Sequence, residues 1–109
     1  MDLIRVMVYM YQTKHKKLEF SRCSTKPRLE AWSDSAWADC LETSRSTGGG
    51  IVTWGGMIID VESKRQSVIA RSSTESELYS MHKVAVNAER IRSILKFLGW
   101  IVPGITLYA

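Results

Sequence analysis

One long amphipathic helix is the strongest structural signal in the sequence. Apolar side chains recur at steps of three and four from residue 78 to residue 98, and Gly99 follows them in the position typical of a helix C-terminus. The apolar stripe consists of Leu78, Met81, Ala85, Ala88, Ile91, Leu95 and Leu98. The helix is preceded by Ser72-Ser73-Thr74, which suits its N-terminus.

Short β-like segments lie on both sides of this helix. Two of them are joined by Gly55-Gly56, which is typical of a hairpin turn. The expected strands cover residues 29–38, 47–54, 57–61, 67–71 and 105–108. Antiparallel strands followed by a crossover helix and a parallel strand predict an α/β fold with a mixed sheet. Because the sequence stops directly after the last strand, we expect this fold to be incomplete at its C-terminus.

The first 28 residues differ in character from the rest of the 109-residue chain. They contain a predicted helix at 2–12, a polar turn at 13–17, a short strand at 18–21 and a linker at 23–28. They hold seven Lys/Arg and two acidic residues, against eight and nine in residues 29–109, so the net charges are +5 and −1. Such a basic segment suits a polyanion such as nucleic acid, although a solvated segment explains the charge equally well.

Membrane insertion and secretion are not expected for this sequence. No apolar run approaches the roughly 18 residues that a membrane-spanning helix needs. The first residues include Asp2 and Arg5 and lack a small-residue cleavage site, so they do not read as a signal peptide. Cys23 and Cys40 have no metal-type spacing and suit two free thiols in a reducing compartment. We therefore expect an intracellular protein, cytoplasmic or nuclear.

Two carboxylates are candidates for chemistry. Asp34 lies inside the first expected strand, on the same face as Trp32, where it needs a partner such as a metal unless it is exposed. Glu77 lies in the first turn of the long helix. The structural alternative for Glu77 is a capping box, because Thr74-x-x-Glu77 and Ser72-x-x-Glu75 both have the required spacing.

Four short segments occur in a fixed order between residue 29 and about residue 100. They are Trp-Ser-Asp-Ser-Ala-Trp-Ala at 32–38, Arg-Ser-Thr-Gly-Gly at 45–49, Val-Glu-Ser-Lys-Arg-Gln-Ser at 61–67 and Ser-Ser-Thr-Glu-Ser-Glu-Leu at 72–78. In this order they resemble the motifs of the ribonuclease H domain of copia-type LTR retrotransposon Pol polyproteins. Residues 1–28 resemble the connection that leads out of the reverse transcriptase in these polyproteins.

The resemblance implies a ribonuclease H-like fold at 29–109 and specific roles for the carboxylates. Asp34 takes the place of the catalytic aspartate of the first strand, Glu77 that of the catalytic glutamate of the helix, and Glu75 that of a capping or surface residue. In this family such acids hold two Mg²⁺ ions roughly 4 Å apart, which activate water and stabilise the leaving oxygen. The implied activity is hydrolysis of the RNA strand of an RNA–DNA hybrid during reverse transcription, beside the reverse transcriptase domain of the parent polyprotein.

The sequence departs from the family pattern at two places. Ala36 stands where the family has a second aspartate, and the sequence ends at Ala109, where the family's third catalytic aspartate follows the strand. Because two carboxylates seldom hold two Mg²⁺ ions, we expect this chain to be inactive or nearly so. The alternatives are a non-catalytic nucleic-acid-binding fragment and a decayed open reading frame. Expected nucleic-acid contacts are Lys14, Lys16, Lys17, Gly48, Gly49 and Ser73.

Overall fold

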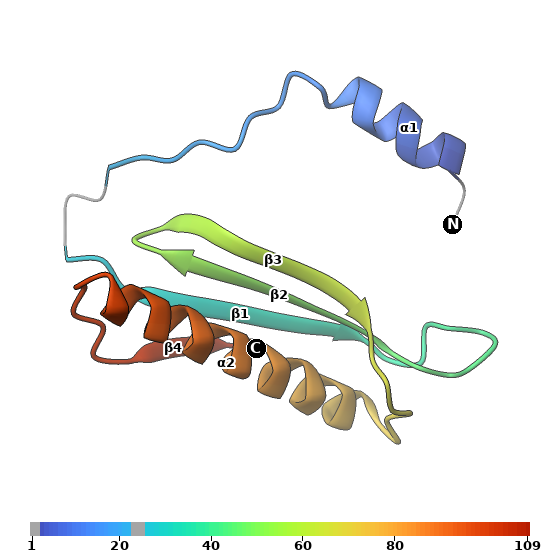
Figure 1. The fold of residues 1–109 in the computed structure, drawn as a ribbon. Coiled ribbons are helices and arrows are strands. Elements are labelled where there is room, and N and C mark those ends of the chain that lie inside the picture. The colour runs from blue at the N-terminus through green and yellow to red at the C-terminus, as the bar shows by residue number, and fades with distance from the viewer. Residues whose placement is uncertain (1–2, 23–25) are drawn as a thin grey trace.

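The computed structural model describes residues 3–22 and 26–109, and Cys23 lies outside them. The elements are α1 (Leu3–Gln12), β1 (Leu29–Ala36), β2 (Thr47–Trp54), β3 (Met57–Arg65), α2 (Ser73–Phe97) and β4 (Ile105–Tyr108). The strands form one sheet in the order β3-β2-β1-β4, and α2 lies across one of its faces (Figure 1). β1, β2 and β3 are antiparallel neighbours, while β4 is parallel to β1. The expected mixed α/β sheet is therefore confirmed.

Two expected strands are absent from the described residues. Residues 67–71 form an irregular connection that pairs with none of the described strands. Within it Ala70 is buried, and its carbonyl oxygen accepts a hydrogen bond from Trp37 Nε1 at 3.1 Å. Residues 18–21 are irregular and exposed, since no described strand pairs with them. Local β-propensity does not make a strand without a partner.

The turns and helix ends follow the sequence closely. Gly55 and Gly56 have φ angles of 60° and 82°, which suit the two-residue turn of the β2–β3 hairpin. Ser72 is the N-cap of α2, and its side chain accepts a hydrogen bond from Glu75 N at 3.1 Å. Gly99 has a φ of 95° directly after the helix, so the expected C-terminal glycine is confirmed.

The face that α2 buries differs from the expected apolar stripe. Its buried residues are Ser76, Ser80, Val84 and Ala88. Leu78 and Leu98, at the two ends of the stripe, are exposed. The cause lies in the sheet: a Cβ on Gly48 would lie 2.6 Å from Ser80 Oγ, and one on Gly50 would lie 2.2 Å from Val84 Cγ2. The glycines let the helix approach so closely that only small or slender side chains fit between the two layers.

The interface between α2 and the sheet has an apolar end and a polar end. The apolar core consists of Leu29, Ala31, Val52, Trp54, Val84, Ala88 and Val102. The polar end, at the start of α2, consists of Ser46, Gln66, Ser76 and Ser80, all buried. Trp54 is the one buried tryptophan in the described core, and Trp100 packs against its ring edge with the centroids 5.8 Å apart.

Helix α1 forms over the expected residues but buries none of them. It packs against no other helix or strand in the part of the chain that the structure describes. Figure 1 shows it well apart from the sheet, at the end of a long irregular segment. Within residues 3–22 and 26–109, neither helix is long and apolar enough to cross a membrane.

Candidate functional site

Asp34 lies near the end of β1 on the sheet face that points away from α2. Its strand neighbours Ser33 and Ser35 are half-buried, whereas Asp34 itself is exposed, as strand alternation requires. Asp34 Oδ1 accepts a hydrogen bond from the backbone N–H of Ser35 at 2.8 Å. The second carboxylate oxygen has no hydrogen bond or ion pair among the described residues, so it is available to a ligand from solvent.

Glu77 is exposed in the first turn of α2, and it does not cap the helix. The capping residues are Ser72 and Glu75: Glu75 Oε2 accepts from the backbone N–H of Arg71 at 2.8 Å. Glu75 Oε1 accepts from Tyr79 Oη at 2.9 Å. The hydrogen bond from the Arg71 N–H and then that from Tyr79 lower the pKa of Glu75 below its ordinary value. Ser72 and Glu75 therefore cap the start of the helix, with the Glu75 carboxylate on the N–H of Arg71 and not on that of Ser72, and Glu77 takes no part in the cap.

A pair of serine hydroxyls joins the segments that carry the two acids. Ser35 Oγ and Ser76 Oγ are 2.6 Å apart, although 41 positions separate them in sequence. Because Ser76 Oγ donates to the carbonyl oxygen of Ser73 at 3.2 Å, Ser35 is the donor in the shared bond. Ser35 follows Asp34 directly and Ser76 precedes Glu77, so this contact brings the neighbouring backbone of both acids together. No hydrogen bond joins the two carboxylates in the described part of the chain.

Gln66 fixes the start of α2 from the other side. Its Nε2 donates to Ser76 O at 2.8 Å and to Ser80 Oγ at 3.1 Å, and its backbone N–H donates to Ser46 O at 2.7 Å. Ser46 Oγ in turn accepts from the backbone N–H of Ala38 at 2.9 Å. The bonds form a polar network between the loop after β1, the residue that follows β3, and α2. The sequence signal was present, since Gln66 and Ser76 both lie in the four ordered segments, but neither was expected as a site residue.

The donor set at Asp34 and Glu77 does not fit two Mg²⁺ ions. Within residues 3–22 and 26–109, no group of three or more His, Cys, Asp or Glu side chains is placed to hold a metal. A pair of Mg²⁺ ions needs several oxygen ligands in near-octahedral geometry, and two exposed carboxylates leave most positions to water. Asp39 is engaged elsewhere, because its Oδ2 accepts from Thr47 Oγ1 at 2.8 Å.

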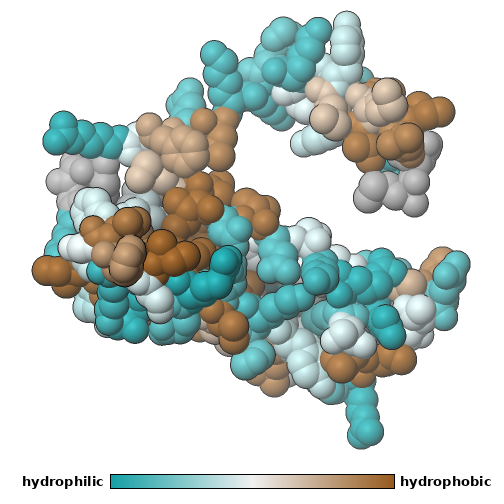
Figure 2. Space-filling model, viewed as in Figure 1, coloured by the Kyte–Doolittle hydropathy of each residue, from teal (hydrophilic) through white to brown (hydrophobic). Residues whose placement is uncertain are grey.

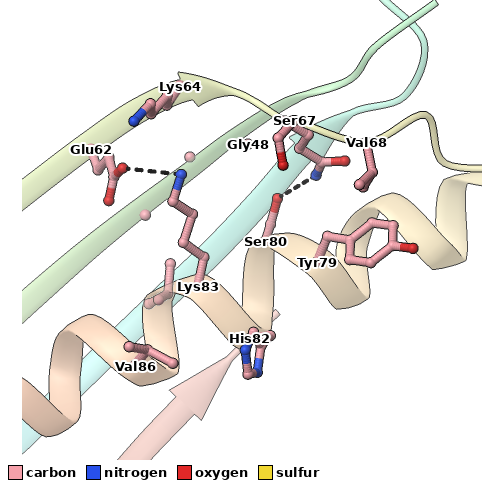
Figure 3. A pocket seen from close by; sticks show the side chains of 14 residues that line it. Gly48, Glu62, Lys64, Ser67, Val68, Tyr79, Ser80, His82, Lys83 and Val86 are labelled. Atoms are coloured by element: carbon pink, nitrogen blue, oxygen red, sulfur yellow. Dashed lines mark hydrogen bonds and ion pairs between the residues drawn. The ribbon is translucent and has the colours of Figure 1, made fainter.

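A groove of about 320 Å³ runs between α2 and β3, on the same side of the sheet as the helix (Figure 3). Gly48 and Gly49 line it, as do the side chains of Lys64 and Lys83. Lys83 Nζ lies 3.5 Å from Glu62 Oε1 at its rim, where solvent weakens the ion pair. Gly48 is required by the close approach of Ser80, so packing alone explains that glycine.

The remaining expected nucleic-acid contacts are not gathered in this groove. Ser73 is exposed at the first position of α2. Lys14, Lys16 and Lys17 are exposed on the segment after α1, which Figure 1 shows apart from α2. Lys14 Nζ lies 4.2 Å from the centre of the Tyr11 ring. The structure therefore brings together the segments of Asp34 and Glu77, and leaves the basic residues separate from them.

Comparisons with known proteins find relatives with different descriptions, among them retrotransposon Pol polyproteins. It is 36% identical over 86 residues to secreted RxLR effector protein 161 of Plasmopara viticola, which covers 79% of this chain and 60% of that protein. It is 40% identical over 77 residues to the uncharacterized mitochondrial protein AtMg00810 of Arabidopsis thaliana, covering 70% of this chain and 32% of that protein. The retrovirus-related Pol polyprotein from transposon RE2 of Arabidopsis thaliana is 35% identical over 97 residues, covering 89% of this chain and 7% of the polyprotein.

These relatives bear on the origin of the chain and do not show its activity. The chain spans 60% of the effector protein and much smaller shares of the other two relatives. Its homologues include retrotransposon Pol polyproteins, and this homology supports a transposon-derived origin. No protein-family model matches the chain. No solved structure matches it either.

Proposed function

We propose that this chain, with retrotransposon Pol polyproteins among its relatives, derives from a ribonuclease H domain of such a polyprotein. The observation that carries the proposal is the hydroxyl contact between Ser35 and Ser76. It joins the strand segment of Asp34 to the helix segment of Glu77, which are the segments that resemble the two catalytic motifs. Exposure of both acids is consistent with access to a large substrate. The mixed sheet with its crossover helix suits a ribonuclease H-like fold.

The parent activity in this proposal is Mg²⁺-dependent hydrolysis of RNA in RNA–DNA hybrids during reverse transcription. Bound Mg²⁺ would supply an activated water and stabilise charge on the leaving oxygen. A hybrid would be held through backbone and 2′-hydroxyl contacts, so the parent domain would show little sequence preference. The parent context would place the domain next to a reverse transcriptase domain, in the cytoplasm or nucleus.

For this chain itself we propose an inactive or nearly inactive product, because Asp34 and Glu77 alone do not complete the donor set. We expect the purified 109-residue chain to cleave an RNA–DNA hybrid no faster than its Asp34→Asn variant at millimolar Mg²⁺. The measurement is release of a labelled RNA fragment, with a single-stranded RNA of the same sequence as a control for contaminating nucleases. Mg²⁺-dependent hybrid cleavage that is lost in both Asp34→Asn and Glu77→Gln would contradict the inactivity and support the site.

A non-catalytic nucleic-acid-binding fragment is the second candidate, because the segment after α1 carries exposed cations. We expect binding to a labelled hybrid to weaken with salt, and the triple variant at Lys14, Lys16 and Lys17 to reduce the salt slope by about two to three. A matched control replaces three exposed cations of the folded part, Lys83, Arg90 and Lys96. Equal slopes for both triple variants would exclude the basic segment as the binding site. Binding without cleavage would favour this candidate over a decayed open reading frame.

A further inference from the structure

The face of the sheet that α2 leaves uncovered carries an apolar row across all four strands. Trp32 of β1 pairs with Ile51 of β2 and with Tyr108 of β4, and Ile51 pairs with Val61 of β3. Paired residues of neighbouring strands point to the same face, so these four side chains lie side by side. Trp32 and Tyr108 stack with their ring centroids 5.0 Å apart. We call this set, Trp32, Ile51, Val61 and Tyr108, the apolar row.

Every member of the apolar row is substantially exposed. The exposed fractions are 38% for Trp32, 37% for Ile51, 63% for Val61 and 42% for Tyr108. Soluble proteins seldom expose a contiguous apolar strip across the width of a sheet. Such a strip is typical of an interaction site. The neighbours on β3 confirm its orientation: Glu62 contacts Lys83 and Asp60 contacts Asn87, both on α2, so Val61 between them points the other way.

Helix α1 carries a second exposed apolar surface, and its length matches that of the apolar row. Leu3, Met7 and Met10 follow one face of α1 and are 71%, 61% and 63% exposed. Figure 2 shows apolar residues gathered on this helix, apart from the body of the molecule. A helix of 10 residues is about 15 Å long. The apolar row spans three strand spacings, or about 14 Å, so α1 can cover it from end to end.

The segment between α1 and the sheet favours contact with another molecule. Residues 13–28 reach up to about 50 Å when extended. Six of them are cationic and one is acidic, and like charges along a linker disfavour compact conformations. The radius of gyration is 16.4 Å, against roughly 13 Å for a compact chain of this size. In the described part of the chain, α1 contacts no helix or strand, so the face of Leu3, Met7 and Met10 is accessible to a second copy.

We propose that the apolar row binds helix α1 of a second copy of this chain, and that two copies exchange their helices reciprocally. The exchange covers both exposed apolar surfaces in two helix–sheet contacts related by a two-fold axis, which leaves neither a free helix nor a free sheet face. The proposal does not depend on any catalytic activity of the chain.

The first test measures the mass of the assembly in solution, for the wild type and for a variant with a charge on the docked face of α1. At tens of micromolar we expect sedimentation equilibrium to give about twice the 12.4 kDa of one chain. Met7→Lys is expected to raise the dissociation constant at least roughly tenfold, because it places a charge on the docked face. Tyr9→Lys, which changes a similarly exposed residue on the opposite side of α1, is the matched control. A monomeric wild type, or a dimer indifferent to Met7→Lys, would overturn the proposal.

The second test distinguishes exchange between copies from folding back within one copy. Val61→Lys damages the sheet surface, and Val86→Lys, at an exposed apolar residue of α2, is its control. The Met7→Lys chain keeps the apolar row of the sheet unchanged, and the Val61→Lys chain keeps the apolar face of α1 unchanged. We expect each to be monomeric alone and the mixture to form a heterodimer held by the one intact contact. If mixing yields no heterodimer although both variants remain folded by circular dichroism, reciprocal exchange is wrong.

Discussion

Replacing Gly50 with alanine is expected to destabilise the protein by about 1–3 kcal/mol, the usual range for overpacking a close contact. The new Cβ would lie 2.2 Å from Val84 Cγ2 and 3.5 Å from Val84 Cβ. Val84 is buried and β-branched, so it has little freedom to rotate away. The helix must therefore move off the sheet, which disturbs the whole apolar core. Urea unfolding followed by circular dichroism measures the loss.

Gly49→Ala is the matched control for this prediction. Gly49 is the neighbouring strand residue, and its added Cβ would meet no atom closer than Glu62 O at 3.6 Å. We expect a change within about 1 kcal/mol, in the stabilising direction, because alanine restricts the unfolded chain more than glycine does. In the double variant Gly50→Ala with Val84→Ala, the two losses should be less than additive. Equal losses at Gly49 and Gly50 would show that α2 does not approach β2 as described.

Appending one aspartate after Ala109 is expected to give the chain, which we propose to be inactive, measurable hybrid cleavage. β4 runs parallel to β1 with Tyr108 beside Trp32. Continuing that register by two residues brings the appended residue level with Asp34 and onto the same face, with the backbones about 4.8 Å apart. The appended carboxylate would then lie beside Asp34 and add a third acid to the proposed site. We expect Mg²⁺-dependent cleavage at least roughly tenfold above that of the same extended chain carrying Asp34→Asn.

An appended asparagine is the control, since it adds the same length without the charge. Binding is followed separately by the shift of the melting temperature with Mg²⁺, which reports a ligand that favours the folded state whether or not cleavage occurs. The aspartate form should show a Mg²⁺-dependent rise and the asparagine form should not. If the two extended chains respond alike in both measurements, the register argument does not locate a metal ligand.

The elements that were predictable from the sequence are those with strong local signals. Ser72, Gly55-Gly56 and Gly99 each act through their own backbone conformation, so the hairpin and the limits of α2 follow from single residues. The buried face of α2 was not predictable in this way. It depends on Gly48 and Gly50, whose missing side chains select Ser80 and Val84 over the larger residues of the apolar stripe.

In the candidate site, too, some features were predictable from the sequence and others depend on tertiary contacts. Asp34 and Glu77 were identified from motif order, and their roles stay predictions. Their relation in space depends on Ser35 and Ser76, which look like ordinary small residues in the sequence and meet only after the fold has formed. The strand at 18–21 was wrong because a strand needs a neighbour, and that property belongs to the tertiary structure.

The two ends of the interface between α2 and the sheet are held together by different interactions. Around Val84 and Ala88 the contact is dry and apolar, so separating the layers there exposes hydrocarbon to water. Around Ser76 and Ser80 the layers are joined by hydroxyl and amide groups, which water can replace one for one. We therefore expect the helix to open first at its N-terminal end, while its C-terminal half stays packed on the sheet. Amide exchange should be faster in the first turns of α2, so the spacing between the backbones of Asp34 and Glu77 fluctuates on the timescale of that opening.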